Sequence, residues 1–281
     1  MNKLRKIKDT AYKWVFFAAT LFGMLALVVL VIDIIYQGMP RLNWDFINNF
    51  PSYNPERSGI KAALWGSIWV IVLTAPMALV LGVSTALYLE EYAKKNWFTR
   101  LVQTNISNLA GVPSIIYGIL GLALFVRAMS LGPSILAGAF TMALLVLPIV
   151  VVAAQEAIRA VPQTLRHGAY ALGASKWQTI RGIVLPSAAP GILTGMILSL
   201  SRAIGETAPL VVVGAFVFVR FVPEDPLDKF TVLPIQIYSW VSQPKQEFHE
   251  LAASGIIILL VVLLLMNATA VFLRNKYQKR F

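Results

Sequence analysis

Arg202 and Glu206 form a charged pair, four residues apart, in a stretch that contains no other charge, residues 188–218. That stretch is long enough to cross a bilayer. A charge at membrane depth costs roughly 3 kcal/mol, so it usually faces a protein interior or a water-filled path. Four residues is about one helical turn, so both side chains lie on one face and neutralise each other. An anion could then compete with Glu206 for the Arg202 guanidinium.

The position of the pair and the residues after it bear on the same chemistry. Arg202 lies about 20 Å beyond Ala189 at about 1.5 Å per residue, near or past the middle of a core about 30 Å thick. Pro209 donates no backbone hydrogen bond and disturbs the carbonyl of Gly205. A break between Gly205 and Pro209 would leave free backbone dipoles beside the charged pair.

We therefore assign Arg202, Glu206 and Thr207 to a substrate pathway. A planar guanidinium binds an anion through two parallel hydrogen bonds, and Glu206 repels the anion so that it leaves. The alternative is a structural ion pair that locks two helices together. We predict no catalytic group, because Glu206 is the only carboxylate firmly at depth and Asp33 lies near the outer end of the first apolar run.

The composition is that of a helical integral membrane protein. Of 281 residues, 58% are hydrophobic and 13% are charged, against about 25% charged in soluble domains. The apolar runs are about 20 residues long rather than alternating, which indicates helices. The chain has no cysteine, and its histidines, His167 and His249, are far apart. The sequence therefore predicts no disulfide, metal site or cofactor.

We expect an all-α, polytopic membrane protein with six transmembrane helices. The predicted spans are residues 14–36, 62–89, 107–129, 134–154, 188–218 and 251–273. They form one domain, residues 14–273, between cytoplasmic tails at 1–13 and 274–281. Prolines and glycines within the spans are typical packing and kinking residues, and Gly111-Val112-Pro113 is the place where a span could be broken.

Positive charge is concentrated on alternate loops. The two tails and the second and fourth loops carry 16 basic and 4 acidic residues, whereas the other three loops carry 7 of each. The positive-inside rule makes the first group cytoplasmic, so both termini are predicted to be inside. We assign the net charge of +11 to this topology and to contact with anionic membrane lipid, rather than to nucleic acid.

The fourth loop, residues 155–187, contains a second signal. Pro162 suits the start of a short helix and Gly173 suits its end, through a left-handed cap. This helix is too short and too polar to span a membrane. A second amphipathic stretch, residues 176–183, follows it and is closed by Leu185-Pro186.

The spacing in this loop resembles that of importer permeases of the ATP-binding-cassette (ABC) class. Ala169, Gly173, Ile183 and Leu185-Pro186 reproduce it, although His167-Gly168-Ala169 replaces the usual opening Glu-Ala-Ala. The resemblance implies the type I importer permease fold, with a short helix that fits a cleft on an ATPase subunit. It assigns the coupling to that ATPase to Leu165, His167, Ala169, Leu172, Gly173, Ile183, Leu185 and Pro186.

The segment around the charged pair narrows the resemblance. Its sequence, Arg202-Ala203-Ile204-Gly205-Glu206-Thr207-Ala208-Pro209-Leu210, resembles the phosphate-specific permeases, and the chain as a whole resembles the A-type subunit of that ABC importer over residues 58–272. This implies import of inorganic phosphate across a bacterial or archaeal plasma or inner membrane. A permease for sulfate, molybdate or a phosphonate, and an uncoupled anion channel, remain as alternatives. Val152-Ala153-Ala154 replaces the polar residues of many relatives, so we predict no second polar site there.

Several partners follow from what the chain lacks. It contains no Gly-x-x-x-x-Gly-Lys-Ser/Thr loop, so we expect a non-enzymatic subunit driven by a separate ABC ATPase dimer. One charged pair in six spans provides few groups that could bind a transported anion. We therefore expect a second, homologous permease, with the substrate pathway between the two subunits.

The external loop, residues 220–250, is long and carries aromatic residues. Tyr238 and Trp240 are interpreted either as interfacial anchors or as part of a docking surface for an external phosphate-binding protein.

The charge distribution makes the topology testable. A reporter enzyme that is active only outside the cytoplasm should be active when it is fused after Arg220 and inactive when it is fused after Phe281. Equal activity at the two positions would contradict six spans with both termini inside.

Overall fold

The computed structural model of the chain describes residues 3–215 and 218–277, and its regular structure over these residues is entirely helical. This confirms the predicted fold class. The α-helices are α1 Lys3–Gly38, α2 Trp44–Asn48, α3 Lys61–Leu87, α4 Trp97–Leu109, α5 Ser114–Gly121, α6 Ile135–Arg159, α7 Gln163–Ala171, α8 Lys176–Thr179, α9 Leu185–Gly205, α10 Ala208–Val213, α11 Leu233–Val241 and α12 Gln246–Tyr277. Short 3₁₀ turns lie at η1 Met39–Arg41 and η2 Pro55–Arg57, and π-helical turns at η3 Tyr88–Tyr92, η4 Leu122–Ala128 and η5 Ile180–Val184.

Five stretches within the described residues are long and apolar enough to cross a membrane, and a bent pair of helices makes a sixth. The predicted first, second and sixth spans lie within α1, α3 with η3, and α12, and the predicted fourth span lies within α6 except for Ser134, the N-cap residue of that helix. The predicted tail 1–13 is helical from Lys3, and the tail 274–281 is helical to Tyr277. Residues 278–281 of that tail lie outside the described part.

The third and fifth spans differ from the predicted ones. The third is not one helix over residues 107–129, because α4 and α5 meet at 105° across the Gly111-Val112-Pro113 break. The fifth does not run to residue 218. It extends from Lys176 to Gly205 as one continuous helical stretch through α8, η5 and α9. The predicted separate amphipathic stretch 176–183 is therefore the first part of this span. Pro186, which donates no hydrogen bond, follows a π-helical turn that lets the helix continue.

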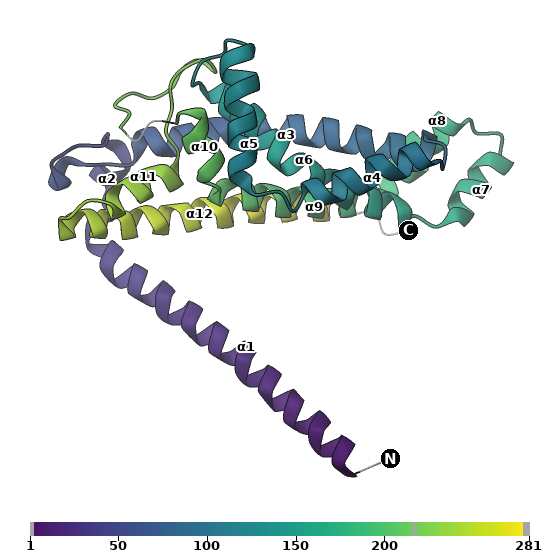
Figure 1. Ribbon diagram of the computed structural model, residues 1–281, viewed down its shortest axis with the longest axis horizontal. Helices are drawn as coiled ribbons and strands as arrows, with labels where there is room; N and C mark the ends of the chain where they lie inside the picture. The colour runs from purple at the N-terminus through teal and green to yellow at the C-terminus, as the bar shows by residue number, and fades with distance from the viewer. Residues whose placement is uncertain (1–2, 216–217, 278–281) are drawn as a thin grey trace.

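The long helices α3, α9 and α12 run side by side, and α5 lies across them (Figure 1). The short helices α7 and α8 lie at one end of this bundle, whereas α2 and α11 lie at the other. Helix α1 diverges from the bundle and shares only its C-terminal end with it, where the Ser254 hydroxyl donates a hydrogen bond to the Gly38 carbonyl at 2.7 Å.

Helix α6 is the centre of the bundle, and 67% of its most apolar window is buried. Gly191 and Gly195 of α9 lie against Ala157 and Ala153 of α6, and a Cβ added at Gly191 would lie only 2.7 Å from the Ala157 Cβ. Such pairs of small residues allow membrane helices to approach closely. Ala153 fills this contact, which explains in packing terms why no polar side chain stands there.

The two broken spans meet each other. Gly118 of α5 lies against Pro209 of α10, so that an added Cβ would lie 2.7 Å from the Pro209 Cα and 2.9 Å from its carbonyl oxygen. Pro209, which interrupts the fifth span, thus packs against α5, the helix that follows the break in the third span.

The loop predicted to be external, residues 220–250, folds onto the bundle instead of standing free. Trp240 is 2% exposed and packs against Phe46, with ring centroids 5.7 Å apart. It is therefore neither an interfacial anchor nor an exposed docking residue, and both predicted roles were wrong for it. Tyr238, on the same helix, is exposed.

Backbone N–H groups of Asp225 and Glu224 donate hydrogen bonds to the Asp228 carboxylate and hold its pKa below the ordinary value.

The contact between the broken spans predicts a specific destabilisation. Gly118→Ala should lower the free energy of unfolding by about 1–3 kcal/mol, because the new methyl group meets backbone atoms of Pro209. Thermal unfolding of the purified protein in detergent measures this effect.

Gly23→Ala is the matched control, since an added Cβ at Gly23 meets no atom within 4 Å. Alanine is favoured over glycine in a helix by about 1 kcal/mol, so this variant should be as stable as the parent or more stable. Equal melting temperatures for the two variants would contradict the close contact.

Candidate functional site

Arg202 and Glu206 form the predicted pair. Arg202 Nε lies 3.4 Å from Glu206 Oε1, and the pair spans the end of α9, since Arg202 lies in its last turn and Glu206 is the residue that ends it. A cation at this position is favoured by the partial negative charge of the helix C-terminus. The interaction confirms that the two side chains share one face.

The predicted break is also present. Glu206 has an extended backbone (φ −77°, ψ 126°), and Thr207 begins α10, accepting a hydrogen bond from Val211 N at 3.1 Å. Pro209, in the first turn of α10, cannot donate to the carbonyl of Gly205, which is the physical reason that α9 stops. Glu206 and Thr207 thus lie in the interruption between the two helices, and Arg202 lies in the last turn of α9 directly before it.

The depth of Arg202 in the membrane stays a prediction, but the helix that carries Arg202 differs from the predicted span. Because the continuous helical stretch begins at Lys176 and ends at Gly205, Arg202 lies near its end and not near the middle of a span over residues 188–218. The side chain of Arg202 is 52% exposed, whereas that of Glu206 is 19% exposed. The guanidinium therefore opens onto the surface of this single chain and is not enclosed by it.

A neighbouring hydrogen bond fixes the side of α9 that faces the bundle. The Ser201 hydroxyl donates to Asn267 Oδ1 of α12 at 2.6 Å. Ser201 is thus turned toward α12, and Ala203 and Ile204 are buried. Arg202 is exposed because Ser201, Ala203 and Ile204, the residues on both sides of it, are used for packing.

The short helix α7 ends as predicted at a left-handed glycine. Gly173 has φ +83°, the Ala174 N–H donates to the Ala169 carbonyl at 3.1 Å, and the Gly173 N–H donates to the Tyr170 carbonyl at 2.9 Å. This pair of bonds is the Schellman motif. The spacing from Ala169 to Gly173 is therefore the spacing that closes this helix.

The next element starts at once. Ser175 and Gln178 form a reciprocal capping box at the start of α8, in which the Ser175 N–H donates to Gln178 Oε1 at 2.7 Å. The turn between α7 and α8 is thus fixed from both sides.

The residues assigned to coupling separate into two groups. Leu165, His167 and Leu172 are exposed on α7, and Leu172 is 91% exposed. Ala169 is buried, so it supports α7 and does not lie on the exposed face. Gly173 is the exposed cap of α7. The other three, Ile183, Leu185 and Pro186, lie half-buried in the long stretch of η5 and α9.

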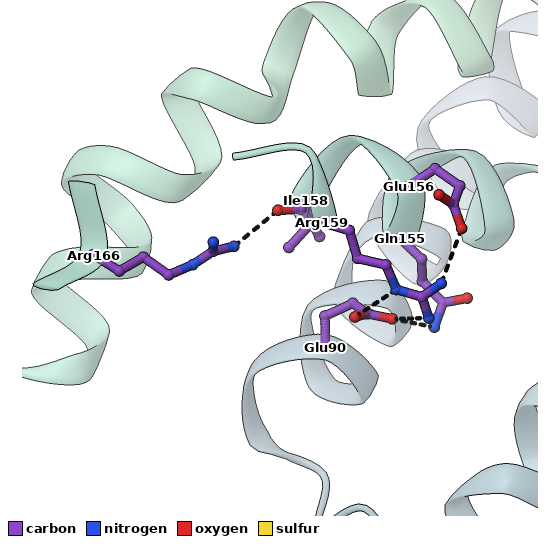
Figure 2. A network of polar contacts seen from close by, with 6 residues as sticks. All are labelled: Glu90, Gln155, Glu156, Ile158, Arg159 and Arg166. Atoms are coloured by element: carbon purple, nitrogen blue, oxygen red, sulfur yellow. Dashed lines mark hydrogen bonds and ion pairs between the residues drawn. The ribbon is translucent and has the colours of Figure 1, made fainter. Parts of the chain in front are cut away.

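Sequence reasoning missed the residue that holds α7 to the bundle. Arg166 is only 6% exposed and bonds to groups outside its own helix (Figure 2). The sequence places Arg166 in a short helix on a loop, but its charge entered only the count of basic residues from which the topology was predicted. Among the described residues there is no cluster of three or more His, Cys, Asp or Glu side chains that could hold a metal ion.

Comparison with known families identifies the class of protein. Residues 78–279 match the family described as "Binding-protein-dependent transport system inner membrane component". The chain belongs to this family. It is accordingly a multi-pass membrane protein, and the helices α3 to α12 form nearly the whole of the matched region.

Individual members of this transport-system family cover almost the whole chain. The phosphate transport system permease protein PstA of Mycobacterium leprae is 36% identical over 97% of this chain and 91% of the relative. PstA of Pasteurella multocida is 32% identical over 95% and 94% of the two chains. These relatives are named as permease subunits and not as enzymes.

Solved structures show the same fold. A chain from the crystal structure of a bacterial alginate ABC transporter in complex with an alginate pentasaccharide-bound periplasmic protein superposes with a TM-score of 0.64, 16% identity and 94% coverage of both chains. A chain from the MetNI methionine ABC transporter, in an inward-facing conformation, gives a TM-score of 0.63 at 16% identity over 77% of this chain and 95% of that one.

The cap of α7 predicts a local change in stability. Gly173→Ala places a Cβ in the left-handed region and should weaken the helix end by about 1–2 kcal/mol. Hydrogen exchange of the backbone amides in residues 163–174 should become faster.

Gly168→Ala is the matched control within the same helix, where an added Cβ meets no atom within 4 Å. Its exchange should be unchanged or slower, because alanine favours the helix. The same exchange rate in both variants would show that the cap does not hold α7.

Proposed function

We propose that this chain is a membrane permease subunit of an ATP-driven importer of inorganic phosphate. The observation that carries the proposal is the pair of Arg202 and Glu206 at the break between α9 and α10, in a chain whose relatives are named phosphate transport permeases. The proposed pathway residues are Arg202, Glu206 and Thr207.

The half-exposed guanidinium supports a path that is shared with a second subunit. An arginine that faces lipid at membrane depth costs roughly 3 kcal/mol, so another protein surface or water must cover it. We infer that a second, homologous permease lies opposite Arg202 and that phosphate passes between the two chains. One chain then supplies only half of the site, which agrees with its single charged pair.

The pair can bind an anion and release it. A guanidinium offers a planar fork of N–H groups that matches two phosphate oxygens, and such charge-assisted bonds are stronger than neutral ones. The present contact to Glu206 is long, at 3.4 Å, and uses a single Nε–H group, so an arriving phosphate has donors left to engage. Glu206 then repels the bound anion and recovers its partner when the anion leaves.

The proposed energy source is a separate ABC ATPase dimer, which α7 contacts through its exposed residues Leu165, His167 and Leu172. The helix projects from the end of the bundle opposite α2 and α11 (Figure 1). By the charge distribution this end is cytoplasmic, and an external phosphate-binding protein would approach the opposite end. Leu165, Tyr170 and Leu172 are exposed apolar or aromatic side chains on or directly after this one short helix, and such a group is typical of a protein contact.

Phosphate uptake by the complete complex in lipid vesicles tests the proposal. The complex with its second permease, ATPase and binding protein should accumulate phosphate only with ATP, and excess sulfate, molybdate or phosphonate should compete weakly. Arg202→Ala should reduce uptake about 100-fold, because two charge-assisted hydrogen bonds are worth about 3 kcal/mol. Arg202→Lys should lose about tenfold, because the charge stays but the fork is lost. Glu206→Gln should bind phosphate and release it more slowly.

Three results would count against the proposal. Stronger competition by another oxyanion would reassign the substrate, and uptake without ATP would indicate a channel. Recovery of both assembly and uptake in the exchanged variant Arg202→Glu, Glu206→Arg would favour a structural ion pair, since a moving anion should sense the order of the charges.

A further inference from the structure

Helix α7 is joined to the bundle by one buried guanidinium. Arg166 Nη1 donates to the Val161 carbonyl at 2.6 Å, and Nη2 donates to the Ile158 carbonyl at 2.8 Å and to Glu91 Oε1 at 3.2 Å. The side chains of Arg166 and Glu91 are 7% and 11% exposed. The Arg166 guanidinium therefore bonds simultaneously to the turn that precedes α7, to the last turn of α6 and to η3, which continues α3.

The adjacent carboxylate makes a second junction at the same place. Glu90 accepts two hydrogen bonds from Arg159, from Nε at 2.9 Å and from Nη2 at 2.6 Å, and a third from Gln155 Nε2 at 2.9 Å. Glu156 accepts a further bond from Arg159 Nη1 at 2.9 Å (Figure 2). Two neighbouring carboxylates of η3 thus hold two arginines, one on α6 and the other on α7.

This arrangement joins α7 to the helices that carry the proposed pathway. The ends of α3 and α6 are tied together by Glu90, and α6 packs closely on α9 through Gly191 and Gly195. Arg202 lies on α9, so Arg166 and Glu90 link α7 to the helix of the charged pair through packed helices. Backbone hydrogen bonds also close the turn at residues 160–162, and α7 contacts α8 and η5. Arg166 adds to these contacts the link between α7 and η3.

We propose that Arg166, through Glu91 and the carbonyls at the end of α6, is a positioning residue that makes α7 move as one body with α3 and α6 during the transport cycle. The inference rests on the proposed function and deepens it, because it names the connection through which movement at the ATPase reaches the membrane helices. Bending between α6 and α7 would break the hydrogen bonds of the buried guanidinium to its three acceptors. A buried charged group that loses its partners is strongly destabilised, so these contacts resist the bending.

The ratio of phosphate taken up to ATP hydrolysed tests the proposal in the complete complex. Arg166→Met and the double variant Arg166→Met, Glu91→Gln should assemble with the ATPase and hydrolyse ATP within about twofold of the parent, because the exposed face of α7 is unchanged; uptake per ATP should fall at least tenfold. Arg166→Lys should fall less, since it keeps the ion pair but not all the carbonyl contacts. Arg181→Met, at an exposed arginine of η5, is the control and should keep the parent ratio.

A merely structural role predicts a different pattern. The amount of assembled complex, ATP hydrolysis and uptake would then fall together, and an unchanged ratio in the double variant would overturn the proposal. If Arg166→Met fails to assemble, Glu91→Gln alone decides, because it removes the ion pair and leaves the carbonyl contacts; its ratio should be lowered.

A second readout does not depend on the transported ion. Spin labels at the exposed residues Gln163 of α7 and Tyr88 of η3 should keep one separation with and without ATP in the parent complex, and should show an ATP-dependent change in Arg166→Met. Identical behaviour of the two proteins would overturn the proposal. Failure of the proposed function has a different signature, since the parent complex would then take up no phosphate while the label distances still report on Arg166.

Discussion

The close approach of α6 to its neighbours is the constraint on which the rest of the structure depends. Lipid is as apolar as the helix surfaces, so membrane helices gain little by hiding apolar area from it and must rely on tight packing and internal hydrogen bonds. Gly191 and Gly195 supply that packing on α9. Gly82 does so on α3, where an added Cβ would lie 2.6 Å from Val150 of α6. Larger residues at these positions would separate the helices and move both polar regions relative to each other.

Two groups of charged side chains lie at helix ends. Arg202 and Glu206 are placed at the end of α9 and Arg159 at the end of α6. Arg166 of α7 donates to the Ile158 carbonyl in the last turn of α6. Helix ends leave backbone carbonyls without partners within the helix, so a guanidinium is favoured there twice, by hydrogen bonds and by the helix dipole. The same interactions thus stabilise two arginines in different settings. Arg202 stays exposed at the surface, whereas Arg166 is buried between α6 and α7.

Local sequence rules predicted the local features well. The break between Gly205 and Pro209, the left-handed Gly173 and the one-turn spacing of Arg202 and Glu206 each depend on a few adjacent residues, and each is present. Features set by distant contacts were mispredicted. Trp240 lies in an external loop by position, yet it is buried against Phe46, and Arg166 is paired with Glu91, 75 positions away. A hydropathy count also merges α9 and α10 into one span, because it does not sense that Pro209 interrupts the helix.

Helix α1 packs against the rest of the described chain only at its C-terminal end. None of its most apolar window is buried by other parts of the described chain, whereas the windows of α3, α6 and α9 are buried in part. Its residence in the bilayer is set by its own partitioning from water into lipid, at a mean hydropathy of 2.8 for that window. It can therefore insert during synthesis before any later helix exists to receive it. A polar substitution in α1 would accordingly be felt as a defect of membrane insertion, while the same substitution in α6 would be felt as a defect of the finished bundle.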